Sequence, residues 1–220
     1  KHYWNNNFHI PAFENERNYI CAIWPSGILE TAKENLYRNS ILQHLDVLMS
    51  DDAYIQTPLW TYFELAKAHQ LLLLEEKKKS WDIVSWFWNN QVIPGLYYWW
   101  EGAGEENSFN EWRNIRGFVS PSRITPHYWT AAEMLLLQLD MLTHYENNSG
   151  KEHIIIGLGI PGIWLKDSIE VKSLRLPDRT ISWRWVKNRM LIEVKGKSIG
   201  VELAPVFPEN TEIVMIDNLQ

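Results

Sequence analysis

The spacing of apolar residues changes in the second half of the chain, and this change limits the possible folds more than any other feature. Residues 59–74 and 125–145 repeat apolar side chains with helical periodicity, which predicts amphipathic helices. Beyond them, runs such as 181–185 alternate apolar and polar residues between turn residues, which predicts short strands. We therefore expect an α+β chain by segment, with a helical domain over residues 1–150 and a small antiparallel β-sandwich over residues 151–220.

Composition argues against several classes of function. The 220 residues carry a formal net charge of −6, whereas a nucleic-acid surface gathers Lys and Arg. The single cysteine, Cys21, rules out an internal disulfide, and no apolar run approaches the ~20 residues of a membrane span. The seven histidines lack metal-ligand spacing, and no glycine-rich phosphate loop precedes a helix. We therefore expect no metal, cofactor, nucleic acid or membrane partner, and the compartment is not indicated.

Residues 95–137 combine aromatic, acidic and basic side chains with glycine and proline. The chain contains 13 tryptophans, and four of them lie in this segment with five carboxylates and three arginines. Tryptophan faces stack on the C–H faces of sugar rings, while carboxylates and guanidinium groups bind the sugar hydroxyls. The segment therefore predicts a site for a carbohydrate substrate, with Trp99, Trp100 and Trp129 as its stacking walls.

Glu101 is the candidate for the chemical centre of this site. It follows two tryptophans and precedes Gly102-Ala103-Gly104, a backbone small enough for a substrate to approach closely. An inverting glycosidase needs one carboxylate that activates water and a second carboxyl that protonates the leaving group. We assign the first role to Glu101. Its competitors in the same segment are Glu105, Glu106 and Glu111.

Further candidates for sugar contacts lie near the predicted junctions between loops and helices. They are Trp24, Trp60, Tyr62, Arg113 and His127. Arg113 could instead pair with a neighbouring glutamate, and His127 could cap a helix or belong to the core.

Two predicted helix starts share a pattern. Thr57-Pro58 and Thr125-Pro126 each place an N-cap residue before a proline suited to the first helical position. The sequence Trp-Thr-x-x-Glu follows both, at 60–64 and 129–133. Since residues four apart share a helix face, each start offers a ring beside a carboxylate. This pattern is either a repeat of stacked helical hairpins or a coincidence of two short motifs.

Three phrases resemble a known group of enzymes: WPSGILE at 24–30, TPHYWTAAEMLLLQLDML at 125–142 and GLGIPGIWLKDSIEVKSLRLP at 157–177. They are similar to the C-terminal end of the six-hairpin (α/α toroid) glycoside hydrolases, where the last barrel helix passes into a β-domain. The resemblance implies helical hairpins of an incomplete α/α toroid followed by a β-sandwich. It also implies glycosidic hydrolysis by inversion, with Glu101 as general base. The general acid would then lie in the remainder of the parent chain, or in a partner chain that completes the toroid.

Two other classes of function stay open. One is a non-catalytic carbohydrate-binding or scaffold module, for which the lack of a general acid would be normal. A polysaccharide lyase or phosphorylase on the same scaffold is the other, and a lyase would use a Tyr–His pair such as Tyr128 beside His127.

Overall fold

The structure is a computed structural model, and it describes Trp24 and residues 49–50, 53–54, 59–99, 101–103, 126–148 and 150–218. The chain divides into two compact units, Lys1–Leu137 and Gln138–Gln220, which we call the helical unit and the β unit. The expected domain boundary after residue 150 stays a prediction. Gly150 itself lies in the turn that joins two strands.

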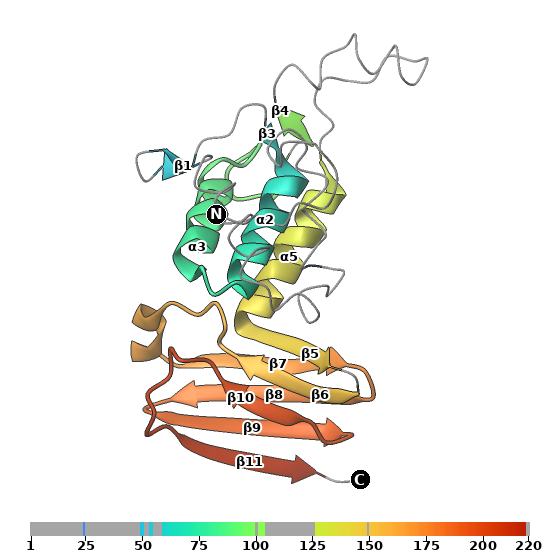
Figure 1. Ribbon diagram of the computed structural model, residues 1–220, viewed down its shortest axis with the longest axis vertical. Helices are drawn as coiled ribbons and strands as arrows, with labels where there is room; N and C mark the ends of the chain where they lie inside the picture. The colour runs from blue at the N-terminus through green and yellow to red at the C-terminus, as the bar shows by residue number, and fades with distance from the viewer. Residues whose placement is uncertain are drawn as a thin grey trace, which may run out of the picture. The chain divides into compact units, whose positions relative to one another are not determined.

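The described residues of the helical unit contain helices and two very short strand pairs (Figure 1). The helices are α2 (Thr61–Leu73), α3 (Lys77–Asn89) and most of α5 (Tyr128–Leu142). The strand pairs, both antiparallel, are β1 (Met49–Ser50) with β2 (Ala53–Tyr54), and β3 (Leu59–Trp60) with β4 (Gly102–Ala103). Because β3 leads directly into α2, the β3–β4 pair holds the segment at 101–103 beside the start of α2.

A left-handed residue ends α2 and turns the chain into α3. Glu75 has a φ of 67°. Its N–H donates to the carbonyl of Leu72, and the N–H of Glu76 donates to the carbonyl of Leu71. These are the two bonds of a Schellman motif, which supplies partners for carbonyls at a helix end. The short connection makes α2 and α3 a helical hairpin.

The two helices of this hairpin are buried to different extents. In α3 the buried residues recur at the spacing of one helix face, so α3 is amphipathic; they are Ser80, Ile83, Val84 and Phe87. In α2 every residue from Glu64 to Leu72 is buried. α2 is therefore the central helix of the described helical unit.

The β unit contains two mixed sheets (Figure 1). One has the strand order β10–β6–β5 and the other the order β11–β9–β8–β7. Neighbouring strands are antiparallel, except that β10 is parallel to β6 and β11 is parallel to β9. The elements are β5 (Thr143–Asn148), β6 (Lys151–Ile156), the 3₁₀ helix η4 (Gly162–Lys166), β7 (Ile169–Leu176), β8 (Arg179–Val186), β9 (Arg189–Gly196), β10 (Gly200–Leu203) and β11 (Glu212–Asn218).

A two-residue turn joins β8 to β9. Lys187 and Asn188 both have positive φ, at 48° and 63°. Positive φ at both central residues is the signature of a type I′ turn, whose twist matches that of the flanking strands. Lys187 and Asn188 therefore close the hairpin as a two-residue turn.

Alternation along the strands builds one core from the inward faces of both sheets. The buried members of this core are Ile154, Ile156, Ile160, Ile181, Trp183, Trp185, Met190, Ile192, Val194 and Phe207. The indole N–H of Trp183 donates to Thr143 Oγ1 at 2.7 Å, and that of Trp185 donates to the carbonyl of Leu165 at 2.9 Å. Both large rings are thus buried without an unpaired donor.

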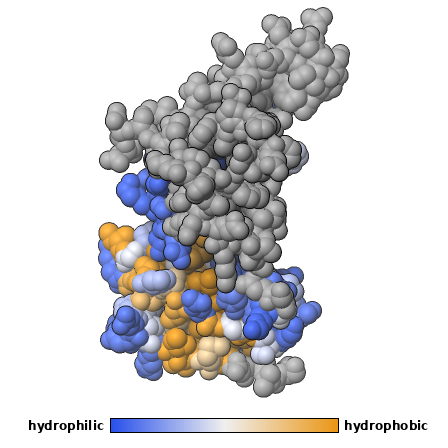
Figure 2. All heavy atoms as spheres, in the orientation of Figure 1, coloured by the Kyte–Doolittle hydropathy of each residue, from blue (hydrophilic) through white to orange (hydrophobic). Residues whose placement is uncertain are grey.

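Apolar side chains also reach the surface of the β unit. Figure 2 shows them gathered among hydrophilic residues on the viewed face. The large exposed apolar side chains of this unit belong to η4 and β11: Ile163, Trp164, Ile213, Met215 and Ile216. η4 is a short element, and β11 is an edge strand of its sheet.

The expected α/α toroid is wrong for the part of the chain that the structure describes. That part holds three α-helices, of which α2 and α3 form one hairpin, and no ring of hairpins is visible in it. The resemblance to the six-hairpin glycoside hydrolases is therefore not supported. Helical periodicity indicates which face of each helix is buried, but it does not specify the neighbour that buries it.

The rest of the expected fold class needs correction too. The sheets are mixed and not purely antiparallel, because the loops after β9 and β10 return the chain beside strands that run in the same direction. The last helix also ends earlier than expected, at Leu142, since Thr143 already belongs to β5. α5 begins at Tyr128, two residues after Pro126, so this proline precedes the helix. Thr57, Pro58 and Thr125 lie outside the described residues.

Candidate functional site

One short segment receives the first backbone donors of two helices. The N–H of Thr61, the first residue of α2, donates to the carbonyl of Glu101 at 3.0 Å. The N–H of His127, just before α5, donates to the carbonyl of Trp99 at 2.9 Å. Helix starts leave such donors without intrahelical partners, so these two bonds bring Glu101 and His127 to the same end of the helical unit.

A chain of side-chain contacts joins the same residues. The hydroxyl of Thr61 lies 3.0 Å from the carbonyl oxygen of Glu101 and 2.6 Å from the hydroxyl of Thr130. The Thr130 hydroxyl also lies 2.6 Å from Nδ1 of His127. Both threonines are fully buried, while Glu101 and His127 are partly exposed. The functional groups at the surface are therefore connected through a buried polar link.

Aromatic rings surround this link on its exposed side. Trp129 is 69% exposed and Tyr128 is 77% exposed, although both are large aromatic residues. The Trp129 ring meets the ring of Tyr62 edge-on, with centroids 6.1 Å apart, and lies 5.8 Å from the ring of His127. An exposed indole beside polar groups is a surface on which a sugar ring can stack.

Two electrostatic effects act on His127 in opposite directions. Partial burial lowers the pKa of its imidazole, and the negative charge of Glu101 raises it; burial is the larger effect. Since the ordinary pKa of histidine is about 6.5, the net lowering keeps this ring neutral at pH 7. The Coulombic effect also places the Glu101 carboxylate within electrostatic range of the ring.

Trp24 lies against a second polar group of the helical unit. Its ring stacks on His69 with centroids 4.4 Å apart, and its N–H donates to Glu133 Oε2 at 3.3 Å. Nδ1 of His69 lies 2.8 Å from Glu133 Oε1. Glu64 has a comparable partner, because the Lys67 ammonium donates to it at 2.6 Å. The carboxylates of the two Trp-Thr-x-x-Glu motifs are therefore buried and engaged within the protein.

Trp99 belongs to the core of the helical unit. It is 1% exposed, its indole N–H donates to the carbonyl of Phe87 at 2.8 Å, and its ring meets Phe87 edge-on. A buried ring cannot offer a face to a ligand, so Trp99 is not a stacking wall of the site. Its backbone carbonyl accepts the hydrogen bond from His127, just before α5.

The remaining candidates fall beyond what the structure describes. Trp100, Glu105, Glu106, Glu111 and Arg113 lie outside the described residues, and for Trp60 only the strand position is described. Within the described ranges, no group of three or more His, Cys, Asp or Glu side chains could hold a metal ion. Of the helices described, none is both long and apolar enough to span a membrane.

Known proteins offer no relative from which a role could be transferred. No family model, no curated protein and no solved structure matches this chain.

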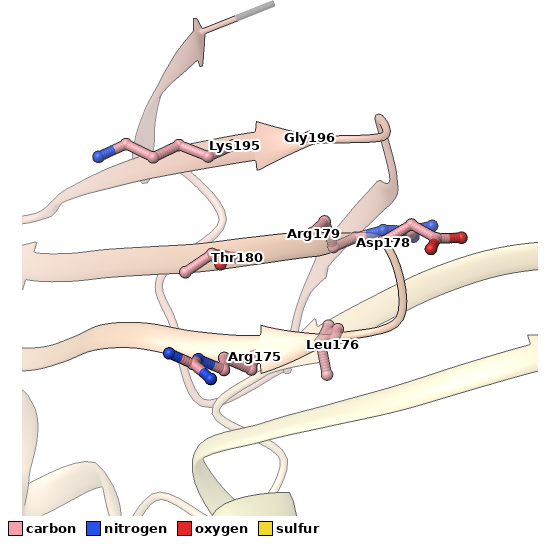
Figure 3. A pocket seen from close by; sticks show the side chains of 7 residues that line it. All are labelled: Arg175, Leu176, Asp178, Arg179, Thr180, Lys195 and Gly196. Atoms are coloured by element: carbon pink, nitrogen blue, oxygen red, sulfur yellow. The ribbon is translucent and has the colours of Figure 1, made fainter. Parts of the chain in front are cut away.

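The β unit has a separate hollow of about 810 Å³. Figure 3 shows Arg175 and Lys195 on the strands either side of Thr180, with their side chains extending the same way. Its lining residues are Arg175, Leu176, Asp178, Arg179, Thr180, Lys195 and Gly196. This lining holds three basic residues and one carboxylate, and Lys195 also pairs with Glu193 at 3.2 Å. The hollow thus has a modest excess of positive charge and no aromatic wall.

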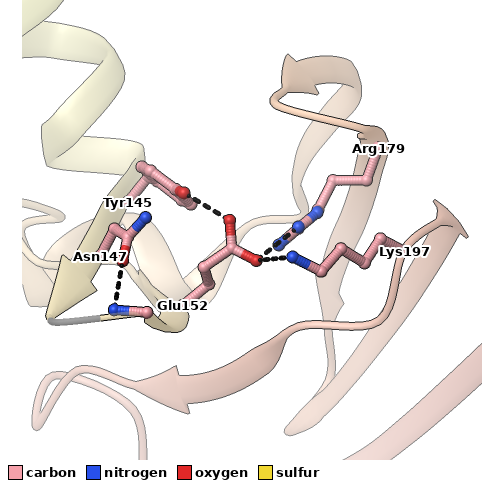
Figure 4. A network of polar contacts seen from close by, with 6 residues as sticks. Tyr145, Asn147, Glu152, Arg179 and Lys197 are labelled. Atoms are coloured by element: carbon pink, nitrogen blue, oxygen red, sulfur yellow. Dashed lines mark hydrogen bonds and ion pairs between the residues drawn. The ribbon is translucent and has the colours of Figure 1, made fainter.

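A carboxylate network lies in the same unit (Figure 4). Glu152 Oε2 accepts from Arg179 Nη2 at 2.8 Å and from Lys197 Nζ at 2.7 Å, and Oε1 accepts from the Tyr145 hydroxyl at 2.8 Å. These bonds, that from Arg179 first, lower the pKa of Glu152 from 4.5 to about 2. The bond to Glu152 in turn raises the pKa of Tyr145. Glu152 thus joins three residues from different strands and turns, which is the pattern of a structural network.

Sequence reasoning missed the two residues that hold the candidate site together. Thr61 and Thr130 are the second residues of the two Trp-Thr-x-x-Glu motifs, in which the sequence indicated a role only for the ring and the carboxylate. The signal was present, since threonine at the start of a buried helix needs a partner for its hydroxyl. The motif could not indicate that the two threonines would be partners of each other.

Proposed function

We propose that the helical unit binds a carbohydrate at the common end of α2 and α5 and hydrolyses a glycosidic bond there, with Glu101 as general base. The observation that carries this proposal is the grouping of Glu101, His127, Trp129 and Tyr62 within one set of contacts. The 69% exposed ring of Trp129 supplies a stacking face, and the polar groups beside it supply partners for hydroxyls.

The reaction follows from the chemistry of one carboxylate and one water. Glu101 removes a proton from a water molecule as the water oxygen attacks the anomeric carbon. The bond from that carbon to the leaving oxygen breaks, and a second carboxyl donates a proton to the leaving oxygen. The configuration inverts because water enters opposite to the leaving group. Glu64 and Glu133 are both bonded inside the protein, so we assign the second carboxyl to a residue outside the described part of the chain, or to a partner.

One observation favours a second candidate function. Because the motif carboxylates Glu64 and Glu133 are occupied by Lys67 and His69, the described site offers Glu101 without a neighbouring acid. A non-catalytic carbohydrate-binding module needs only the aromatic wall and the polar contacts. In this second function Glu101 would accept sugar hydroxyls and would not activate water.

The test uses substrates that need no general acid. Dinitrophenyl glycosides of several common sugars have leaving groups that depart without protonation, so a general base alone can accelerate their hydrolysis. We expect the chain to hydrolyse one of them, and Glu101→Gln to lose at least ~10²-fold in rate while retaining sugar affinity. Glu193→Gln, on β9, is the matched control.

The outcomes separate the two functions. If Glu101→Gln hydrolyses the activated glycoside at the rate of the parent chain, Glu101 has no part in the mechanism. Oligosaccharide binding without hydrolysis of any activated glycoside would favour the binding module. If calorimetric titration with a panel of neutral oligosaccharides shows no binding at all, the carbohydrate proposal itself is wrong.

A further inference from the structure

Three hydrogen-bond contacts in series link His127 to Glu101 through Thr130 and Thr61. The distances are 2.6 Å from His127 Nδ1 to the Thr130 hydroxyl, 2.6 Å from that hydroxyl to the Thr61 hydroxyl, and 3.0 Å from the Thr61 hydroxyl to the Glu101 carbonyl oxygen. A carbonyl oxygen can only accept, while each hydroxyl has one proton to donate. The direction of proton donation along these hydrogen bonds is therefore determined at the Glu101 carbonyl.

Counting from that end assigns each proton. Thr61 donates its proton to the carbonyl of Glu101, so it must accept from Thr130. Thr130 has then used its own proton and must accept from His127. It follows that Nδ1 of His127 carries a proton, and in a neutral imidazole the other nitrogen, Nε2, is then an acceptor.

The surroundings of His127 agree with a neutral ring and a free acceptor. Burial lowers the pKa of this imidazole more than the charge of Glu101 raises it. Among the described residues, no hydrogen-bond partner of Nε2 is found. The ring is partly exposed and lies beside the exposed indole of Trp129, on which the proposed sugar would stack.

We propose that His127 is a specificity-determining residue of the carbohydrate site, whose Nε2 accepts a hydrogen bond from one sugar hydroxyl, and that Thr130 and Thr61 are positioning residues that fix its tautomer. This inference rests on the proposed function, because it names what one residue of that same site recognises. The buried threonines also connect the imidazole to the backbone carbonyl of Glu101.

The first experiment examines the tautomer without any sugar. Two-bond ¹H–¹⁵N correlation spectra of the parent chain at neutral pH should show His127 protonated at Nδ1 and unprotonated at Nε2. Thr130→Ser keeps the hydroxyl and should keep this pattern, whereas Thr130→Val removes the hydroxyl and should lose the preference. A parent His127 protonated at Nε2 would mean that the chain of bonds runs the other way, and would overturn the proposal.

The second experiment measures binding of neutral oligosaccharides by calorimetry. His127→Asn keeps an N–H near the position of Nδ1 but lacks an acceptor at Nε2, and it should bind about tenfold more weakly, the scale of one lost hydrogen bond. His127→Gln keeps an amide group near the position of Nε2 and should retain more of the affinity. His153→Asn, on β6, is the control, and circular dichroism checks the fold of each variant.

Binding measurements distinguish a wrong role for His127 from a wrong carbohydrate site. If the parent binds a sugar and both His127 variants bind it equally well, His127 is not the acceptor, although the carbohydrate site stands. If the parent binds no sugar in the panel, the proposed function fails and the specificity role fails with it. Single-deoxy analogues of a bound sugar complete the test. One analogue should bind the parent more weakly than the full sugar does, whereas His127→Asn should bind that analogue and the full sugar with equal affinity.

Discussion

The side-chain hydroxyls of Thr61 and Thr130 lie 2.6 Å apart, although 69 residues separate them in the chain. They occupy the same place in two copies of the Trp-Thr-x-x-Glu motif, so equivalent positions of the two motifs meet. Both hydroxyls are buried, and a buried hydroxyl without a partner is costly. The contact therefore joins the starts of α2 and α5 beside the residues of the candidate site.

The Thr61–Thr130 contact should be visible in stability. Thr61→Val and Thr130→Val keep the shape of the side chain but remove the hydroxyl, and each should lower the free energy of unfolding by about 1–3 kcal/mol, since each leaves a buried partner unpaired. The double variant should lose less than the sum of the two, because neither orphaned hydroxyl remains.

Urea denaturation of the four proteins measures this coupling. Thr180→Val, at a half-buried position on β8, is the control and should change stability by no more than about 0.5 kcal/mol. Strictly additive losses for the two buried threonines would show that their hydroxyls do not depend on each other.

Glu75 occupies a backbone position that favours glycine. Its φ of 67° costs a residue with a Cβ roughly 1–2 kcal/mol, whereas glycine adopts the conformation freely. Glu75→Gly should therefore raise the unfolding free energy by up to about 1 kcal/mol, after allowing for the greater freedom of glycine in the unfolded chain. Glu76→Gly, at a position with a φ of −84°, has no such strain to relieve and should not stabilise. Thermal denaturation of both variants decides the matter, and a destabilised Glu75→Gly would contradict the prediction.

Gly159 leaves no space for a side chain. A Cβ at this position would overlap the side chain of Met141 and lie 2.9 Å from its Cα, where the end of α5 cannot easily move. Gly159→Ala should destabilise the β unit by about 1–3 kcal/mol, the usual effect of overpacking. Gly162→Ala meets nothing closer than 3.9 Å and serves as the matched control. Equal denaturation midpoints for the two alanine variants would show that the junction at Met141 is looser than described.

The Glu152 network predicts how stability responds to acid. Hydrogen bonds from Arg179, Lys197 and Tyr145 lower the pKa of Glu152 from 4.5 to about 2 in the folded protein. Because the folded pKa lies below the unfolded one, this contribution to stability is present above pH ~4.5 and is lost as the pH falls toward 2. Glu152→Gln should therefore lower the urea midpoint at pH 7 and flatten its decline between pH 5 and pH 3.

A surface ion pair provides the comparison for Glu152. Glu212→Gln breaks an exposed pair with Arg189, and such pairs contribute little in water. The acid profile of this variant should follow that of the parent. A Glu152→Gln profile parallel to that of the parent would mean that the network does not hold this carboxylate ionised.

Trp129 should carry much of the sugar affinity. Its ring is exposed and flanked by Tyr62 and His127, so its removal deletes a stacking face with little effect on the core. Trp129→Ala should weaken oligosaccharide binding by about 1–3 kcal/mol, the scale of burying one large apolar side chain, and leave the thermal midpoint nearly unchanged. Trp88→Ala, on α3, is the control for a general loss of tryptophan. Full affinity in a folded Trp129→Ala would place the site elsewhere.

Some features of the candidate site were accessible from sequence and others were not. The composition of residues 95–137 indicated that Glu101, His127 and Trp129 belong together, and the structure brings these three to one end of the helical unit. It did not indicate that Trp99 is buried against Phe87 while Trp129 is exposed. Two tryptophans of equal hydrophobicity differ only in what packs against them, and that depends on segments distant in sequence.

The sequence by itself determined the local elements: helical periodicity over α2 and most of α5, and alternation along β8. These features arise from interactions within a few residues, so a short window contains their cause. Only the tertiary structure decided that β10 and β11 pair in parallel with β6 and β9, that three helices and two mixed sheets replace the expected toroid, and that Thr61 meets Thr130. Such pairings depend on closing long loops and on filling a shared core, and neither the entropy of closure nor the fit of distant surfaces is recorded in local periodicity.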